Sequence, residues 1–87
     1  MKVAVWDTYV KRQDGKIMHF DILVKSELKD EKSIYRYGNA YLSSKQFETN
    51  AITSKACKLC HIEIAPEAIV NSINDKGFHI IEIENCD

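Results

Sequence analysis

The chain has 87 residues, of which 45% are hydrophobic and 29% are charged, and its formal net charge is -1. This composition is typical of one soluble globular domain and excludes a disordered chain. A nearly neutral chain without a lysine or arginine cluster offers no electrostatic footprint for nucleic acid or for an anionic membrane, so neither is an expected partner.

No export or membrane signal is visible. Residues 1–7 lack the apolar core of a secretory signal and reach an acidic residue at once. No apolar run approaches the ~20 residues of a membrane span. We therefore expect a cytoplasmic protein whose three cysteines stay reduced, and the odd number also argues against a disulfide framework.

A hairpin is predicted at the start of the chain. Residues 3–10 are rich in β-branched and aromatic side chains, and residues 17–25 alternate in hydrophobicity. Between them, Asp14-Gly15 favours a two-residue type I′ loop. That loop would pair Tyr9 with Phe20 and Val5 with Val24 on the core face. On the other face it would pair Val10 with His19, Thr8 with Asp21, and Trp6 with Leu23. A change of one residue in loop length would swap the faces.

Two helices are predicted next. Asp30 is a candidate N-cap for a helix to about Ser43, and Gly38 inside it costs ~1 kcal/mol relative to alanine, which indicates close packing onto the sheet. Pro66 opens the second helix and Gly77 ends it. The expected buried stripes are Ile34, Tyr37, Gly38, Tyr41 and Leu42 in the first helix, and Ile69, Val70 and Ile73 in the second.

Two further strands, residues 50–53 and 78–84, complete an α+β fold of order ββαβαβ in a single domain, residues 1–87. Ser54 would cap a helical turn that carries Cys57. Because helical crossovers usually join parallel strands, a four-stranded mixed sheet is expected. Helices on one face make a two-layer form, which we favour over helices on opposite faces. The face with Trp6, His19 and Leu23 would then stay open as a candidate homodimer surface.

The stretch Cys57-Lys58-Leu59-Cys60-His61 is the main candidate for chemistry. If the third and fourth strands run parallel, their ends emerge at one edge of the sheet and bring Cys86 to Cys57. A C-x-x-C hook with one distant thiolate and one imidazole is the ligand set of a structural zinc site. Zinc at Cys57, Cys60, His61 and Cys86 is therefore the candidate cofactor.

Other interpretations of this motif stay open. Cys57 and Cys60 can be small half-buried hydrophobic residues. They can also be a thiol redox pair, with Cys86 as resolving thiol, if a helix N-terminus lowers a thiol pKa. C-x-x-C-H is the haem attachment motif of c-type cytochromes as well, but the absence of an export signal argues against haem.

His19 and Asp21 form a second, weaker candidate site. They lie two residues apart on one predicted strand and share a face, where a carboxylate can orient a histidine as a general base. No nucleophile or oxyanion donor is identifiable beside them, and a solvated polar pair is the simpler interpretation. We expect no enzymatic activity of the chain by itself.

Three motifs occur in order along the chain: Val5-Trp6-Asp7-Thr8-Tyr9-Val10 with Asp14-Gly15 and Met18-His19-Phe20-Asp21, then Cys57-Lys58-Leu59-Cys60-His61 with Ala65-Pro66, and then Gly77-Phe78 through Glu82-Ile83-Glu84 to Cys86. Together they resemble the bacterial domain of unknown function 2024 family (DUF2024), over essentially the whole chain. Asn85 stands where a glycine is expected. The resemblance implies a compact α+β protein of the bacterial cytoplasm and no particular activity.

The sequence thus predicts a small binding or interaction module with a candidate zinc site. The alternative is a thiol-disulfide redox protein that uses Cys57 and Cys60. The sequence indicates neither the partner nor the ligand.

Overall fold

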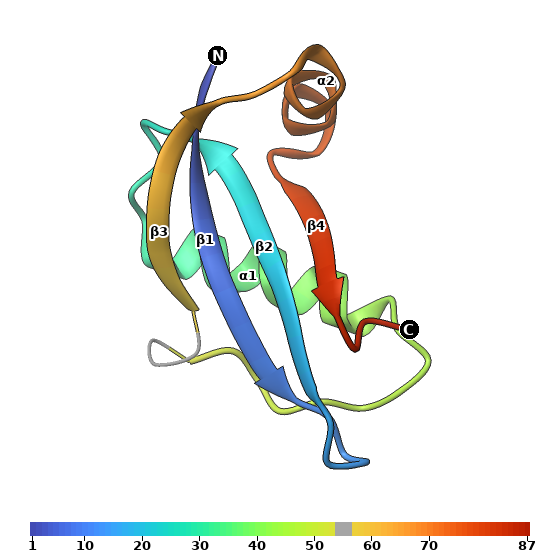
Figure 1. Ribbon diagram of the computed structural model, residues 1–87. Helices are drawn as coiled ribbons and strands as arrows, with labels where there is room; N and C mark the ends of the chain where they lie inside the picture. Colours follow the sequence, from blue (N-terminus) through green and yellow to red (C-terminus); the bar gives the residue numbers. More distant parts are fainter. Residues whose placement is uncertain (54–56) are drawn as a thin grey trace.

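The computed structural model describes residues 1–53 and 57–87 (Figure 1). In chain order its elements are β1 (Lys2–Lys11), β2 (Ile17–Lys25), α1 (Glu31–Ser43), β3 (Cys57–Ile64), α2 (Glu67–Lys76) and β4 (His79–Glu84). The predicted α+β class and the order ββαβαβ are confirmed. None of the described helices is long and apolar enough to cross a membrane.

The sheet has the strand order β3-β1-β2-β4, and every neighbouring pair is antiparallel. The expectation of a mixed sheet is therefore wrong. Helix α2 lies at one end of the sheet, so β4 starts at the end where β3 stops (Figure 1). Because α2 does not run back along the sheet, β3 and β4 point in opposite directions. They also form the two edges of the sheet.

Strand β3 is not where the sequence predicted it. Residues 50–53 form no strand, although Thr49 makes an isolated bridge to Arg12 and Ile52 is buried in the core. Cys57 opens β3 and does not sit on a helical turn, and its predicted cap Ser54 lies outside the described residues. Hydrophobic alternation in β3 is interrupted because the register with β1 shifts at Cys60, which pairs with no residue of β1.

The predicted hairpin register is wrong by one residue. Tyr9 pairs with His19, Thr8 with Phe20, and Lys11 with Ile17. The connection is longer than two residues, since the Arg12 N–H donates to the Lys16 carbonyl at 2.8 Å and Gly15 has a φ of 91°. Every side chain of β1 is consequently on the face opposite to the predicted one, whereas the faces of β2 are as predicted.

The two helices cover opposite faces of the sheet, so the favoured form with both helices on one face is wrong. On the α1 side, Trp6, Phe20 and Ile22 form the main core with Ile34 and Leu42. On the α2 side, Val3, Val5 and Leu23 form a smaller core with Ile73. The proposed dimer face is also wrong, because Trp6 points to α1 and Leu23 is buried near α2.

The predicted helix signals are confirmed. The Asp30 side chain accepts from the Lys32 N–H at the start of α1, and the Gly77 N–H donates to the Ile73 carbonyl at 2.7 Å beyond the end of α2. Gly38 is buried, and a Cβ on it would clash with the side chains of Ile22 and Ile52. Glycine at this position therefore lets α1 pack closely onto the sheet without displacing these two side chains.

Candidate metal site on the open face of the sheet

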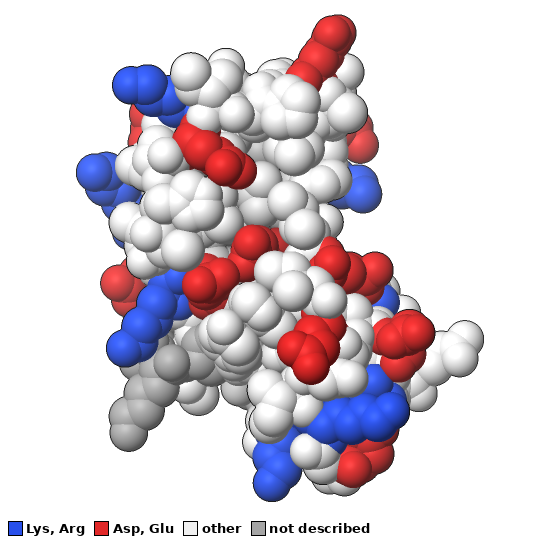
Figure 2. All heavy atoms as spheres, viewed as in Figure 1, with Lys and Arg blue, Asp and Glu red and all other residues white. Residues whose placement is uncertain are grey.

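Most of the α2 side of the sheet is open to solvent. Helix α2 covers only the end where β1 and β2 carry Val3, Val5 and Leu23. Farther along the strands, acidic side chains gather across the middle of this face (Figure 2). The open face is defined here as the α2-side surface of β1 and β2 beyond α2, with Asp7, Tyr9, His19 and Asp21 at its centre.

Three ligand-type side chains converge at this centre. Asp7 and Asp21 are directly paired across β1 and β2, and His19 is two residues before Asp21. The His19 Nε2 lies 3.4 Å from the Asp7 Oδ1 and 3.9 Å from the Asp21 Oδ1. Among the described residues, these three form the group whose potential metal-binding atoms all lie within 4.8 Å of one another.

Tyr9 holds the imidazole of His19 in place. The two rings stack with their centroids 4.1 Å apart and an interplanar angle of 12°. Tyr9 and His19 are a cross-strand pair, so the sheet itself sets this stacking. The stacked ring turns Nε2 toward the two carboxylates and restricts the rotamers of His19.

The two carboxylates are electrostatically strained. Burial raises the pKa of Asp21 to about 6, and the facing Asp7 carboxylate adds to the rise. The pKa of Asp7 is lowered instead, mainly by the hydrogen bond that a protonated Asp21 donates, and burial partly opposes this. The Asp21 Oδ1 is buried and has no hydrogen-bond partner among the described residues. His19 is beside the pair as a side chain that can carry a positive charge, and among the described residues no lysine or arginine forms an ion pair with either carboxylate.

The geometry suits a small divalent cation. Zinc binds imidazole nitrogen and carboxylate oxygen at about 2.0–2.2 Å, so two ligands of a tetrahedral ion are about 3.4 Å apart. The distances from His19 Nε2 to the two carboxylates, 3.4 and 3.9 Å, are close to this value. Three protein ligands at the surface would leave a fourth position to water or to another molecule.

Cys60 and His61 border the site on β3. The Cys60 thiol is exposed and lies 3.3 Å from the Nδ1 of His61, whose Nε2 is 3.1 Å from a carboxylate oxygen of Glu63. Desolvation raises the pKa of Cys60, and so does the nearby negative charge of Asp7. Cys60 therefore faces the carboxylate cluster from the neighbouring strand, outside the group of three.

The four predicted zinc ligands are not brought together. Cys57 and Cys86 are buried on the α1 side of the sheet, whereas Cys60 is exposed on the other side. The predicted meeting of Cys57 and Cys86 at one edge is wrong, because it required parallel strands. Cys57 lies on β3 and Cys86 follows β4, and these strands form opposite edges of the sheet. The two edges are three strand spacings apart, which is about 14 Å.

The same geometry does not favour the redox interpretation. Cys57 and Cys60 lie three residues apart on an extended strand, which separates their Cα atoms by about 10 Å, and a disulfide needs less than about 7 Å. Burial raises the pKa of Cys57, although the Thr8 hydroxyl donates to its sulfur at 3.3 Å. Cys57 behaves as a core residue.

Sequence reasoning found two of the three clustered residues, His19 and Asp21, and missed Asp7. The available signal for Asp7 was its position as the acid that ends the apolar run of residues 3–6. The predicted register placed Thr8 opposite Asp21 and turned Asp7 to the other face. The observed register puts the two acids opposite each other.

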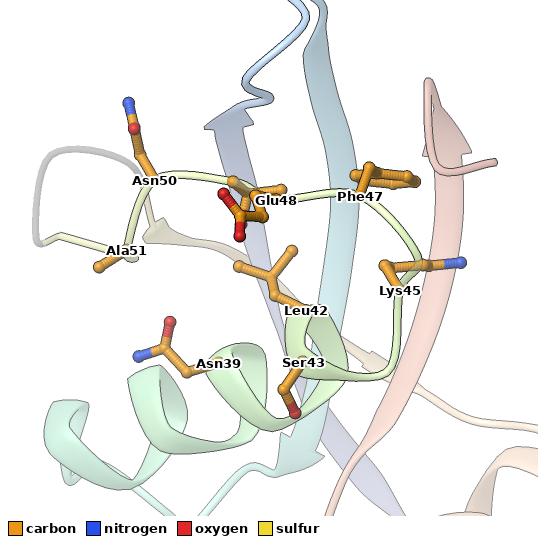
Figure 3. A pocket seen from close by; sticks show the side chains of 9 residues that line it. Asn39, Leu42, Ser43, Lys45, Phe47, Glu48, Asn50 and Ala51 are labelled. Carbon is orange, nitrogen blue, oxygen red and sulfur yellow. The ribbon is translucent and has the colours of Figure 1, made fainter.

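A hollow beside the end of α1 is unrelated to this cluster. It has a volume of about 410 Å³ and is bounded by the end of α1 and the segment after it (Figure 3). Leu42 and Phe47 contribute apolar walls, and Lys45 and Glu48 contribute opposite charges. Its lining contains no histidine or cysteine, so we assign no chemistry to it.

The fold and the cluster define a small α+β protein with an antiparallel four-stranded sheet and a histidine-carboxylate site on its open face. The chain belongs to the family described as "Domain of unknown function (DUF2024)", whose model matches residues 1–83. This confirms the resemblance of the three sequence motifs. The family description assigns no activity.

A solved structure with the same fold comes from a bacterium. The NMR structure of a Nitrosomonas europaea protein is 34% identical in sequence and covers 100% of both chains, with a TM-score of 0.81. The comparison with curated proteins finds no match. These similarities support a small bacterial protein with this topology.

Proposed function

We propose that the protein is a metal-binding module that holds a divalent transition metal ion at Asp7, His19 and Asp21. The observation that carries the proposal is the convergence of these three side chains, with ligand atoms within 4.8 Å of one another. A bound cation would offset the repulsion between the paired carboxylates and would give the buried Asp21 Oδ1 a partner.

Zinc is the ion to test first. One imidazole and two carboxylates suit several first-row divalent ions, and zinc accepts all three ligand types in a four-coordinate site. Cys60 offers a sulfur next to the open position, which would favour zinc over magnesium or calcium. This replaces the predicted set of Cys57, Cys60, His61 and Cys86 by a site on one face of the sheet.

Calorimetric titration of chelator-treated protein with zinc tests the proposal. We expect one ion per chain. His19→Ala and Asp21→Asn should each weaken binding by more than about 10-fold, because even the loss of an outer-shell partner typically costs about 10- to 100-fold. His79→Gln is the matched control, since His79 contacts Ser72 away from the cluster. A Cys57→Ser/Cys86→Ser variant should bind zinc normally. Loss of binding in that variant, or normal binding by Asp21→Asn, would contradict the proposed ligands.

Thermal unfolding provides an independent readout. An ion that binds only the folded state adds about 2.7 kcal/mol of stability at a hundredfold excess over its dissociation constant. The melting temperature of the wild-type chain should therefore rise with zinc concentration. The melting temperature of His19→Ala should not rise with zinc concentration, and circular dichroism of this variant checks that it is folded.

A further inference from the structure

Strand β3 is an exposed edge of the sheet with an unusual surface. Seven of its eight residues pair with β1 on one side, Cys60 being the exception, and no described residue pairs with the strand on the other side. Leu59, Ile62 and Ile64 are 51%, 51% and 77% exposed. Edge strands are normally short, charged or interrupted by proline, because unpaired backbone groups recruit further strands.

The register shift at Cys60 places apolar side chains of β3 on one side of the sheet and charged side chains on the other. Leu59 pairs with Trp6 and Ile62 with Ala4, so both lie on the α1 side although they are three residues apart. Lys58 pairs with Asp7 and Glu63 with Val3, which puts Lys58 and Glu63 together on the open-face side. An uninterrupted strand would place each of these pairs on opposite sides.

We propose that β3 pairs antiparallel with β3 of a second copy of this chain, about a two-fold axis between Cys60 and His61. In this register Lys58 lies opposite Glu63 of the second copy, and Leu59 lies opposite its Ile62. Each contact occurs twice, as two-fold symmetry requires. Opposite charges meet on one side of the joined sheet and apolar side chains meet on the other.

The charge pattern selects both this register and this edge. A slip of one residue would place apolar side chains opposite polar ones, because side chains alternate between faces. The other edge, β4, carries Glu82 and Glu84 and no lysine or arginine of its own. Glu82 is already paired with Lys45, so β4 offers no basic side chain that could pair with the acids of a second copy. The proposal does not depend on the metal site, whose three residues lie on β1 and β2.

Charge-reversal variants of the full chain test the proposal by sedimentation equilibrium. Wild type should be a dimer, and Lys58→Glu and Glu63→Lys should each weaken self-association by about tenfold or more, because both contacts become repulsive. An equimolar mixture of the two variants should form a heterodimer, since all four charges are then complementary. The double variant Lys58→Glu/Glu63→Lys should regain the wild-type dissociation constant. Glu84→Lys, on the other edge, is the control and should remain dimeric.

Circular dichroism of each variant establishes that it is folded before its association is measured. Three results would overturn the proposal. The first is a wild-type chain that stays monomeric at high concentration, which would leave the edge to a different protein or to no partner. The second is undiminished dimers in the single variants, which would point to another surface. The third is a mixture of the variants that does not associate.

Discussion

Asp7 and Asp21 lie directly opposite each other on neighbouring strands, and burial together with this proximity raises the pKa of Asp21 to about 6. Like charges in this arrangement destabilise a sheet. A local conflict of this kind is typical of functional sites, where stability is given up for binding or chemistry. The stacking of Tyr9 on His19 beside this pair supports the same conclusion.

Replacing one of the two acids should stabilise the metal-free protein. At pH 7 Asp21 is ionised in both states, and folding it next to Asp7 is costly. We expect Asp21→Asn to raise the free energy of unfolding at pH 7 by about 1–2 kcal/mol, a range that allows for solvent screening. Urea unfolding in the presence of a chelator measures the change, and a loss of stability at pH 7 would contradict it.

The stability gain expected for Asp21→Asn should depend on pH, and the direction of this dependence follows from the raised pKa of Asp21. Asp21 has a raised pKa in the folded state, so the folded chain binds its proton more tightly than the unfolded chain, whose pKa is near 3.9. The stability contribution of Asp21 is therefore greatest below about pH 4 and is lost as the pH rises through 6. The difference between Asp21→Asn and wild type should shrink steadily from pH 7 to pH 4. A difference that stays constant over this range would show that Asp21 does not titrate as described.

Gly38 should not tolerate a side chain. A Cβ at this position would lie 2.9 Å from the Ile22 Cδ1 and would also clash with Ile52. Despite the better helix propensity of alanine, Gly38→Ala should destabilise the protein by about 1–3 kcal/mol through overpacking. Arg36→Ala, at an exposed position of α1, is the control and should change stability little. Thermal or urea unfolding compares the two.

Arg12 should anchor the end of the chain. Its guanidinium is largely buried, donates to the backbone oxygens of Asn85 and Asp87 at 3.1 and 2.8 Å, and lies 3.7 Å from the Phe47 ring centroid. Arg12→Met would leave both oxygens without this donor, and we expect a loss of about 2–4 kcal/mol. Arg12→Lys keeps the charge but not the fork of donors, so it should lose less stability. Unfolding measurements, with limited proteolysis of residues 85–87, compare the two variants.

The three cysteines should react with iodoacetamide in a fixed order. Cys60 is exposed and should react in the native protein, whereas Cys57 and Cys86 are buried and should react only on unfolding. Asp7→Asn removes a negative charge that raises the pKa of Cys60, so it should increase the native alkylation rate several-fold at pH 7. Mass spectrometry of timed samples identifies the modified residues. Equal rates at Cys57 and Cys60 would contradict the burial of Cys57.

Local signals were sufficient for the helices and for most of the hairpin. Asp30, Pro66 and Gly77 mark helix ends because their effects act within one turn of the chain. The alternation of residues 17–25 placed His19 and Asp21 on one face correctly. Strand β3 was missed, since the register shift at Cys60 breaks the alternation of Cys57 and Leu59 with Ile62 and Ile64.

The sequence by itself determined the α+β class, the order of the elements, both helices and the faces of β2, because each of these depends on short-range periodicity or capping. Only the tertiary structure decided the strand order, the antiparallel direction of β4 and the pairing of Asp7 with Asp21. These depend on the path of the connections and on a hairpin loop longer than Asp14-Gly15 alone. A shift of one residue in that loop turns a side chain from one face of the sheet to the other, and so decides whether the two carboxylates meet.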